Sequence, residues 1–125
     1  MDASVYQKMR VKPQTVGRYF YAPKDYIEMT KSQTHIDFLG EHPTFFHLFV
    51  TSQEEYDTRI LDVLPLLKDH NSRLWISYKK ASKNKTYDIN RDTFFALSKR
   101  DGLTPFSNVA LDREWSCLGF KKAQQ

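Results

Sequence analysis

Phe45-Phe46-His47-Leu48-Phe49-Val50 is the longest apolar run of this 125-residue chain, and only His47 interrupts it. A strand with one face in water alternates apolar and polar residues, whereas a continuous apolar run is typical of a strand covered on both faces. Such strands lie in the middle of parallel sheets, where helices pack on either side. The run therefore predicts an α/β fold with residues 45–50 as a central strand.

The residues that follow this strand predict a helix. Ser52 and Glu55 are spaced as in a capping box, in which the serine hydroxyl accepts a hydrogen bond from the amide of the third helical residue. Pro65 removes one hydrogen bond of this helix, so we expect the last turns to bend. Apolar residues recur along the segment with the spacing of one helix face: Tyr56, Ile60, Val63, Leu64 and Leu67.

Strands and helices alternate along the rest of the chain, which predicts a mostly parallel sheet with right-handed crossovers. Residues 112–114 are the whole connection between the last two strands, and so short a connection allows only an antiparallel hairpin. We expect one domain over residues 11–122, preceded by a flexible N-terminal arm over residues 1–10. The remaining expected elements are strands over 15–21, 34–39, 74–78, 107–111 and 115–120 and helices over 24–31 and 90–100.

Composition excludes several classes of function. Cys117 is the only cysteine, which excludes an internal disulfide, a thiolate zinc site and a CxxC redox pair. The histidines lack metal-ligand spacing, so we expect no metal site. No apolar stretch approaches the about 20 residues that cross a bilayer, and the N-terminus lacks the apolar region of a signal peptide. We therefore expect a cytoplasmic protein without a membrane partner.

Five short segments resemble a family of small bacterial proteins of unknown function. The resemblance extends over about residues 10–121, and members of the family resemble a shortened methyltransferase-type Rossmann domain. It is carried by the order and spacing of Val11-Lys12-Pro13, Tyr21-Ala22-Pro23, Phe49-Val50-Thr51-Ser52, Arg73-Leu74-Trp75-Ile76-Ser77-Tyr78-Lys79-Lys80 and Asp112-Arg113-Glu114-Trp115-Ser116.

The resemblance implies a three-layer, six-stranded, methyltransferase-like sheet. It implies a spatial order, by first residue, of 34, 15, 45, 73, 115 and 107, with the strand at 115 antiparallel to the others. The family carries no established activity, so the resemblance implies no catalytic residue. Ligands of such sheets bind at the carboxyl ends of the strands, near the point where the strand order reverses.

A cofactor site at that edge would use the segment after the first strand. Dinucleotide and S-adenosylmethionine sites use glycines there, because the backbone must approach the ligand closely. This chain has none in Ala22-Pro23-Lys24-Asp25-Tyr26. We therefore predict no cofactor. The alternative, a small-molecule methyltransferase with an atypical loop, would bind S-adenosylmethionine near Ala22, Asp25, Tyr26, Asp37 and Thr51.

Basic residues concentrate after the strand that ends at Tyr78. Residues 79–91 contain five basic residues and one acidic residue, so their charge is 5 − 1 = +4. The helix that follows could add free amides for an anion. The leading hypothesis is a non-enzymatic binding or interaction module for an anionic small molecule or an acidic protein, with the site formed by Tyr78, Lys79, Lys80, Lys83 and Arg91.

Two other interpretations of this loop stay open. Runs of lysines are often solvated surface loops without a ligand. Clustered lysines also attract phosphates, and Tyr78 and Tyr87 could stack on bases, so weak nucleic-acid binding is a second alternative. Elsewhere, we expect His47 and Cys117 to be packed in the core, and no set of catalytic residues can be assembled.

Overall fold

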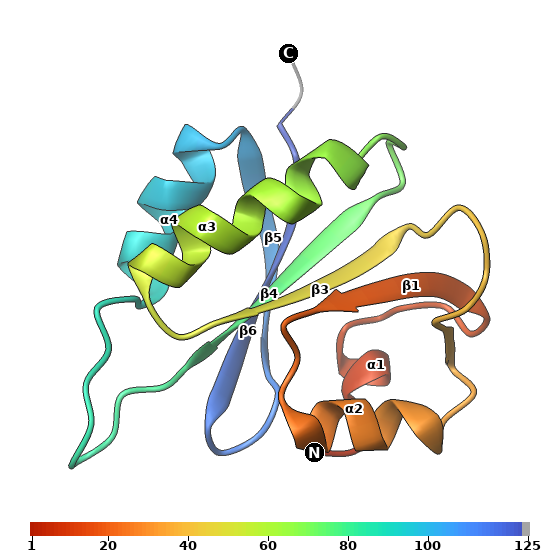
Figure 1. The fold of residues 1–125 in the computed structure, drawn as a ribbon, viewed down its shortest axis with the longest axis horizontal. Helices are drawn as coiled ribbons and strands as arrows, with labels where there is room; N and C mark the ends of the chain where they lie inside the picture. Colours follow the sequence, from red (N-terminus) through yellow and green to blue (C-terminus); the bar gives the residue numbers. More distant parts are fainter. Residues whose placement is uncertain (124–125) are drawn as a thin grey trace.

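The computed structural model describes residues 1–123 and contains a six-stranded sheet (Figure 1). The strand order is β2-β1-β3-β4-β6-β5, as expected. Residues 111–114 connect β5 and β6 in an antiparallel hairpin, as expected. The strands are β1 (Thr15–Phe20), β2 (Ile36–Asp37), β3 (Phe45–Val50), β4 (Arg73–Lys79), β5 (Leu103–Ala110) and β6 (Trp115–Lys122).

The apolar run forms the centre of the sheet. β3 pairs in parallel with β1 on one side and with β4 on the other, and all six of its residues are buried. β6 is antiparallel to both β4 and β5. The chain therefore has the mostly parallel α/β sheet with a C-terminal antiparallel hairpin that the sequence predicts.

Helices cover both faces of this sheet (Figure 1). One core lies between the sheet and the pair α3 and α4, and the other lies beneath α1 and α2. No helix among residues 1–123 is long and apolar enough to span a membrane. The helices are α1 (Val5–Lys8), α2 (Lys24–Lys31), α3 (Gln53–Val63) and α4 (Arg91–Arg100), and Pro65 lies in the short 3-10 helix η1 (Leu64–Leu66) that ends α3.

Part of the N-terminal segment, for which the sequence predicts a flexible arm over residues 1–10, packs in the core. Val5, Tyr6 and Met9 are buried in the core beneath α1 and α2. The Tyr6 ring stacks on His35 and meets Phe45 edge-on. A helix of one turn is too short to show apolar periodicity, which is why the sequence pattern does not reveal it.

Two strands differ from their expected ranges by several residues, whereas the other strands differ by at most two residues. β2 has only two residues, because the Gln33 side chain bonds both backbone groups of Ile36 and the Asp37 carboxylate then turns the chain. β5 begins at Leu103 and contains a bulge between Pro105 and Ser107.

A chain of buried hydrogen bonds crosses the core beneath α1 and α2. His47 Nδ1 lies 2.9 Å from the hydroxyl of Tyr26, and His47 Nε2 lies 2.7 Å from the hydroxyl of Ser77. The Tyr6 hydroxyl donates to that of Tyr26 at 2.9 Å. Burial lowers the pKa of His47 to about 3, so the ring is neutral at physiological pH.

The neutral state of His47 predicts acid sensitivity. The pKa of His47 in the unfolded chain is about 6.5, whereas burial lowers it to about 3 in the folded protein. Below pH 6.5, His47 is protonated in the unfolded chain but stays neutral in the folded protein. The free energy of unfolding should therefore fall by about 1 kcal/mol for each pH unit below 6.5. Urea denaturation between pH 7 and pH 5 measures this slope.

The matched control is His47→Gln, whose amide keeps a donor and an acceptor but does not titrate. This variant should be less stable at pH 7 and should show a clearly shallower slope. Equal slopes in the two proteins would show that His47 does not control the acid response.

Candidate functional site

The carboxyl edge of the sheet contains the point where strand order reverses. The chain leaves β1 toward β2 on one side and returns to place β3 on the other side. In open α/β sheets this is the usual location of a ligand. Tyr21 follows β1 and Thr51 follows β3, so these two residues mark the site in this chain.

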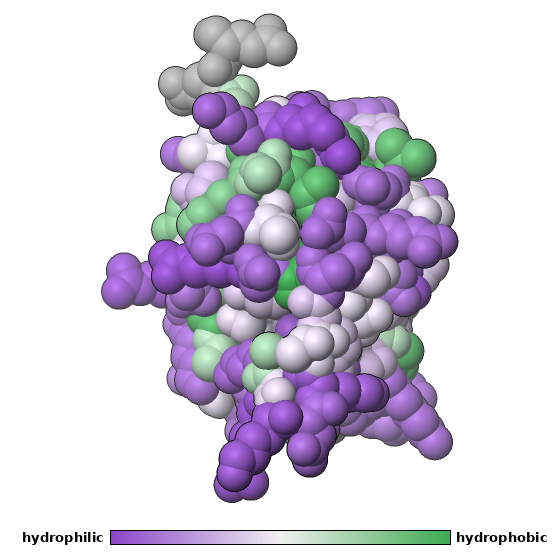
Figure 2. Space-filling model, turned by 90° about the vertical axis from the view of Figure 1, so that its left-hand side faces the viewer, coloured by the Kyte–Doolittle hydropathy of each residue, from purple (hydrophilic) through white to green (hydrophobic). Residues whose placement is uncertain are grey.

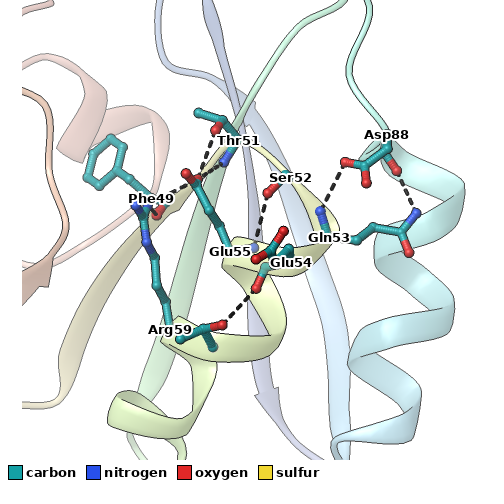
Figure 3. Close-up of polar contacts among 9 residues, drawn as sticks. Phe49, Thr51, Ser52, Gln53, Glu54, Glu55, Arg59 and Asp88 are labelled. Atoms are coloured by element: carbon teal, nitrogen blue, oxygen red, sulfur yellow. Dashed lines mark hydrogen bonds and ion pairs between the residues drawn. The ribbon is translucent and has the colours of Figure 1, made fainter.

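Side chains of α3 fill the edge beside β3 (Figure 3). Glu55 accepts hydrogen bonds from the backbone amide and the hydroxyl of Thr51, at 2.7 and 2.8 Å. Arg59 donates to the carbonyl of Phe49 at 2.9 Å and forms an ion pair with Glu55. Ser52 caps the helix as predicted, but Glu55 bonds Thr51 instead of completing the capping box. Thr51 is therefore already hydrogen-bonded within the protein.

Tyr21 is not among the candidate site residues predicted from the sequence, although its backbone conformation at this edge is unusual. Its φ of 57° lies in the left-handed region, which favours glycine. The Arg59 guanidinium lies 4.5 Å from the centre of the Tyr21 ring, and the Tyr21 hydroxyl donates to Asp62. An aromatic residue directly after the first strand, where glycines serve in cofactor sites, is the signal that could have revealed it.

A small cavity of about 380 Å³ lies between Tyr21 and the first turns of α3. Its lining includes two carboxylates, Glu54 and Glu55, and one cation, Arg59. Arg59 is already paired with Glu55. This cavity therefore offers little attraction to an anionic group.

The other expected cofactor residues are engaged within the protein. Tyr26 is fully buried, and burial raises the pKa of its hydroxyl well above the ordinary value. Asp37 accepts from the amides of Leu39 and Gly40. Asp25, at the start of α2, accepts from the amide of Tyr26, and Ala22 is half-buried against the core beneath α1 and α2. These contacts do not fit a bound S-adenosylmethionine.

The loop between β4 and α4 is anchored at its first end by the β5–β6 hairpin. Lys79 forms an ion pair with Glu114, and its ammonium lies 4.7 Å from the centre of the Trp115 ring. Lys80 donates to the carbonyl of Asp112 at 2.9 Å. Tyr78, the tyrosine of β4, is buried.

The second end of the loop is held by α3 (Figure 3). The carboxylate of Asp88 accepts from the backbone amide of Gln53, and the Gln53 side chain donates to the carbonyl of Asp88. Two of the amides expected to be free at the start of α4, those of Asp92 and Thr93, donate to the side chain of Asn90.

The middle of the loop is exposed from Ala81 to Thr86. Lys83 and Lys85 project from this part and form no ion pair within the described range 1–123. Arg91 is exposed at the start of α4, with its guanidinium 5.5 Å from the centre of the Phe95 ring. Figure 2 faces the side of α3 and α4 and shows hydrophilic side chains at the lower end of the molecule, where this loop lies in Figure 1.

Cys117 lies in β6 and faces the buried histidine. Its sulfur is 4.0 Å from His47 Nε2, and the residue is fully buried. Burial raises the pKa of the thiol to about 12, so the thiol stays protonated. A reactive thiolate is not formed in this environment.

Comparison with solved structures identifies the fold. Magnesium protoporphyrin IX methyltransferase from Synechocystis PCC 6803, solved with bound SAM, matches with a TM-score of 0.55 and 10% sequence identity. The match covers 97% of this chain and 76% of the methyltransferase. No family model and no curated protein matches the sequence. The chain therefore has the fold of a compact methyltransferase-like Rossmann domain, and the likeness extends to the fold alone.

Proposed function

We propose that this chain is a non-enzymatic interaction module whose loop between β4 and α4 binds an acidic partner protein. The observation that carries the proposal is a basic loop fixed at both ends and exposed in its middle. Lys79 and Lys80 hold one end, and the Gln53–Asp88 contact holds the other. A loop held in this way loses little conformational freedom when it binds.

The charge of the loop is largely available to a partner. Glu114 neutralises Lys79, whereas Lys80 donates to a carbonyl and keeps its full charge. Lys83 and Lys85 add two further charges on the exposed part. Clustered positive charge of this kind accelerates association with an acidic surface and sets its salt dependence.

The shape of the loop favours a protein over a small anion. Residues 81–86 are all exposed, and two amides at the start of α4, those of Asp92 and Thr93, already donate to Asn90. Nucleic-acid binding at this loop lacks a base-stacking ring, because Tyr78 is buried and Tyr87 is half-buried against the core. A broad acidic surface is the partner that fits.

A charge-reversal variant tests the loop. Lys83→Glu combined with Lys85→Glu should leave the fold unchanged, since neither side chain forms an ion pair among residues 1–123. We expect a hexaglutamate peptide to shift the amide signals of residues 80–91 in labelled wild-type protein, and the double variant to weaken this binding at least tenfold. An NMR titration at low salt measures both.

The control is Lys99→Gln, an exposed change on α4 outside the loop, which should bind like wild type. Pyrophosphate forms a second arm of the experiment. Saturation of the loop by pyrophosphate with no response to the peptide would identify a small-anion site instead. No response of residues 80–91 to the peptide would also refute the acidic partner.

A second titration tests the enzymatic alternative. Because Tyr26, Asp37 and Thr51 are engaged within the protein, millimolar S-adenosylmethionine should cause no saturable shifts in residues 20–26, 36–38 and 50–53. Saturable shifts confined to these segments would contradict the proposal and revive a methyltransferase with an atypical loop.

A further inference from the structure

A second basic site lies away from the loop, at the amino ends of the central strands. A groove of about 890 Å³ is lined by fifteen residues from four separate parts of the chain, one of which is the start of β3. Residues 8–12 form one rim, the start of β4 forms the end, and residues 106–109 of β5 form the opposite wall. Neither the sequence analysis nor the proposed function involves this groove.

The groove is strongly positive. Lys8, Arg10, Lys12 and Arg73 line it, and the lining contains no acidic residue. Its formal charge of +4 equals the net charge of the whole chain. Within the described range 1–123, none of these four cations has a carboxylate at ion-pair distance, and Arg73 donates only to the carbonyls of His70 and Ser72. The groove therefore has unneutralised charge for an anion.

The basic rim is fixed in place. The amide of Val11 donates to the carbonyl of Tyr6, and the carbonyl of Val11 bonds the ring of His35. Met9 is buried beneath the rim. Arg10 itself has a φ of 58°, a left-handed conformation that is costly for a residue with a side chain. The cations are thus presented by an ordered backbone.

The opposite wall contains an exposed aromatic ring that a β-bulge places there. Leu103 and Val109 are six residues apart and would face the same side of a regular strand, yet they belong to opposite cores. The bulge at Phe106 causes this change of face. Phe106 is 44% exposed and meets the Trp75 ring edge-on.

Gly119 makes room for this arrangement. A Cβ atom at Gly119 would lie 2.9 Å from both Phe106 and Trp75, so any side chain would displace the two rings. Arg73 lies 5.8 Å from the centre of the Phe106 ring, which places a cation beside the aromatic wall.

We infer that this groove binds a nucleotide unit, with its phosphates on the basic rim and its base against Phe106. Cationic side chains attract phosphates, and an exposed aromatic ring stacks on any base. The groove has the size of small-molecule sites, which typically measure about 300–1,000 Å³. Asn71 and Asn108 also line it and offer amide groups to the edge of a base.

Three probes separate the contributions of phosphate and base. Labelled protein is titrated with ADP, with pyrophosphate and with the oligonucleotide r(A)6, and amide shifts are followed. ADP should shift residues 8–12, 71–75 and 106–109 and should bind more tightly than pyrophosphate, which lacks a ring. Tighter binding of r(A)6 than of ADP would identify a single strand as the source of the nucleotide, and the reverse would identify a free nucleotide.

Two variants measure separately what the basic rim and the aromatic wall contribute to binding. Arg10→Gln combined with Lys12→Gln should weaken ADP and pyrophosphate alike, by about tenfold. Phe106→Leu should weaken ADP by about fivefold or more, because stacking is lost, and should leave pyrophosphate unchanged. Lys99→Gln on α4 is the matched control and should bind like wild type, and thermal unfolding reports whether each variant is folded.

Two results would overturn the inference. Equal affinity for ADP and pyrophosphate, with no effect of Phe106→Leu, would show that the groove binds a simple anion. Shifts confined to residues 79–91 would place the anion on the loop between β4 and α4 and leave this groove without a ligand.

Discussion

A fully buried neutral imidazole must have both of its nitrogens hydrogen-bonded, and His47 imposes this requirement on the centre of the sheet. Its partners are Tyr26 from α2 and Ser77 from β4. Tyr26 in turn bonds Tyr6 from α1. One ring in β3 thus determines how two helices and a neighbouring strand are placed, and an unpaired group here would cost about 1–3 kcal/mol.

Much of this architecture could be predicted from local patterns, whereas the details that depend on distant contacts could not. The apolar run at 45–50 and the cap at Ser52 correctly indicated the central strand and the longest helix. Residues 5–8 form a helix too short for periodicity. The bulge at Phe106 depends on Gly119 in another strand.

In the candidate sites, too, local sequence patterns predict some features, whereas contacts between distant residues determine the others. The lysines at 79–85 could be identified as a basic loop because they are adjacent in the sequence. The contacts of Lys79 and Lys80 with the β5–β6 hairpin follow from the register of β4 with β6, which no local pattern specifies. The basic groove combines residues 8–12, Arg73 and Phe106, so only the folded chain shows that they belong together.

The N-terminal segment contributes both to the hydrogen bonds of the core and to the charge of the groove, so a single cleavage within it would affect both. Tyr6 completes the hydrogen bonds of the core, and Lys8 and Arg10 lie only two and four residues further along the chain. Arg10 is exposed, and the bond that follows it meets the specificity of a trypsin-like protease. Cutting there would break the covalent link between the rest of the chain and a segment that contains Tyr6 and two of the four cations of the groove. Proteolytic cleavage at this bond would therefore change both the stability of the folded protein and the charge of the groove.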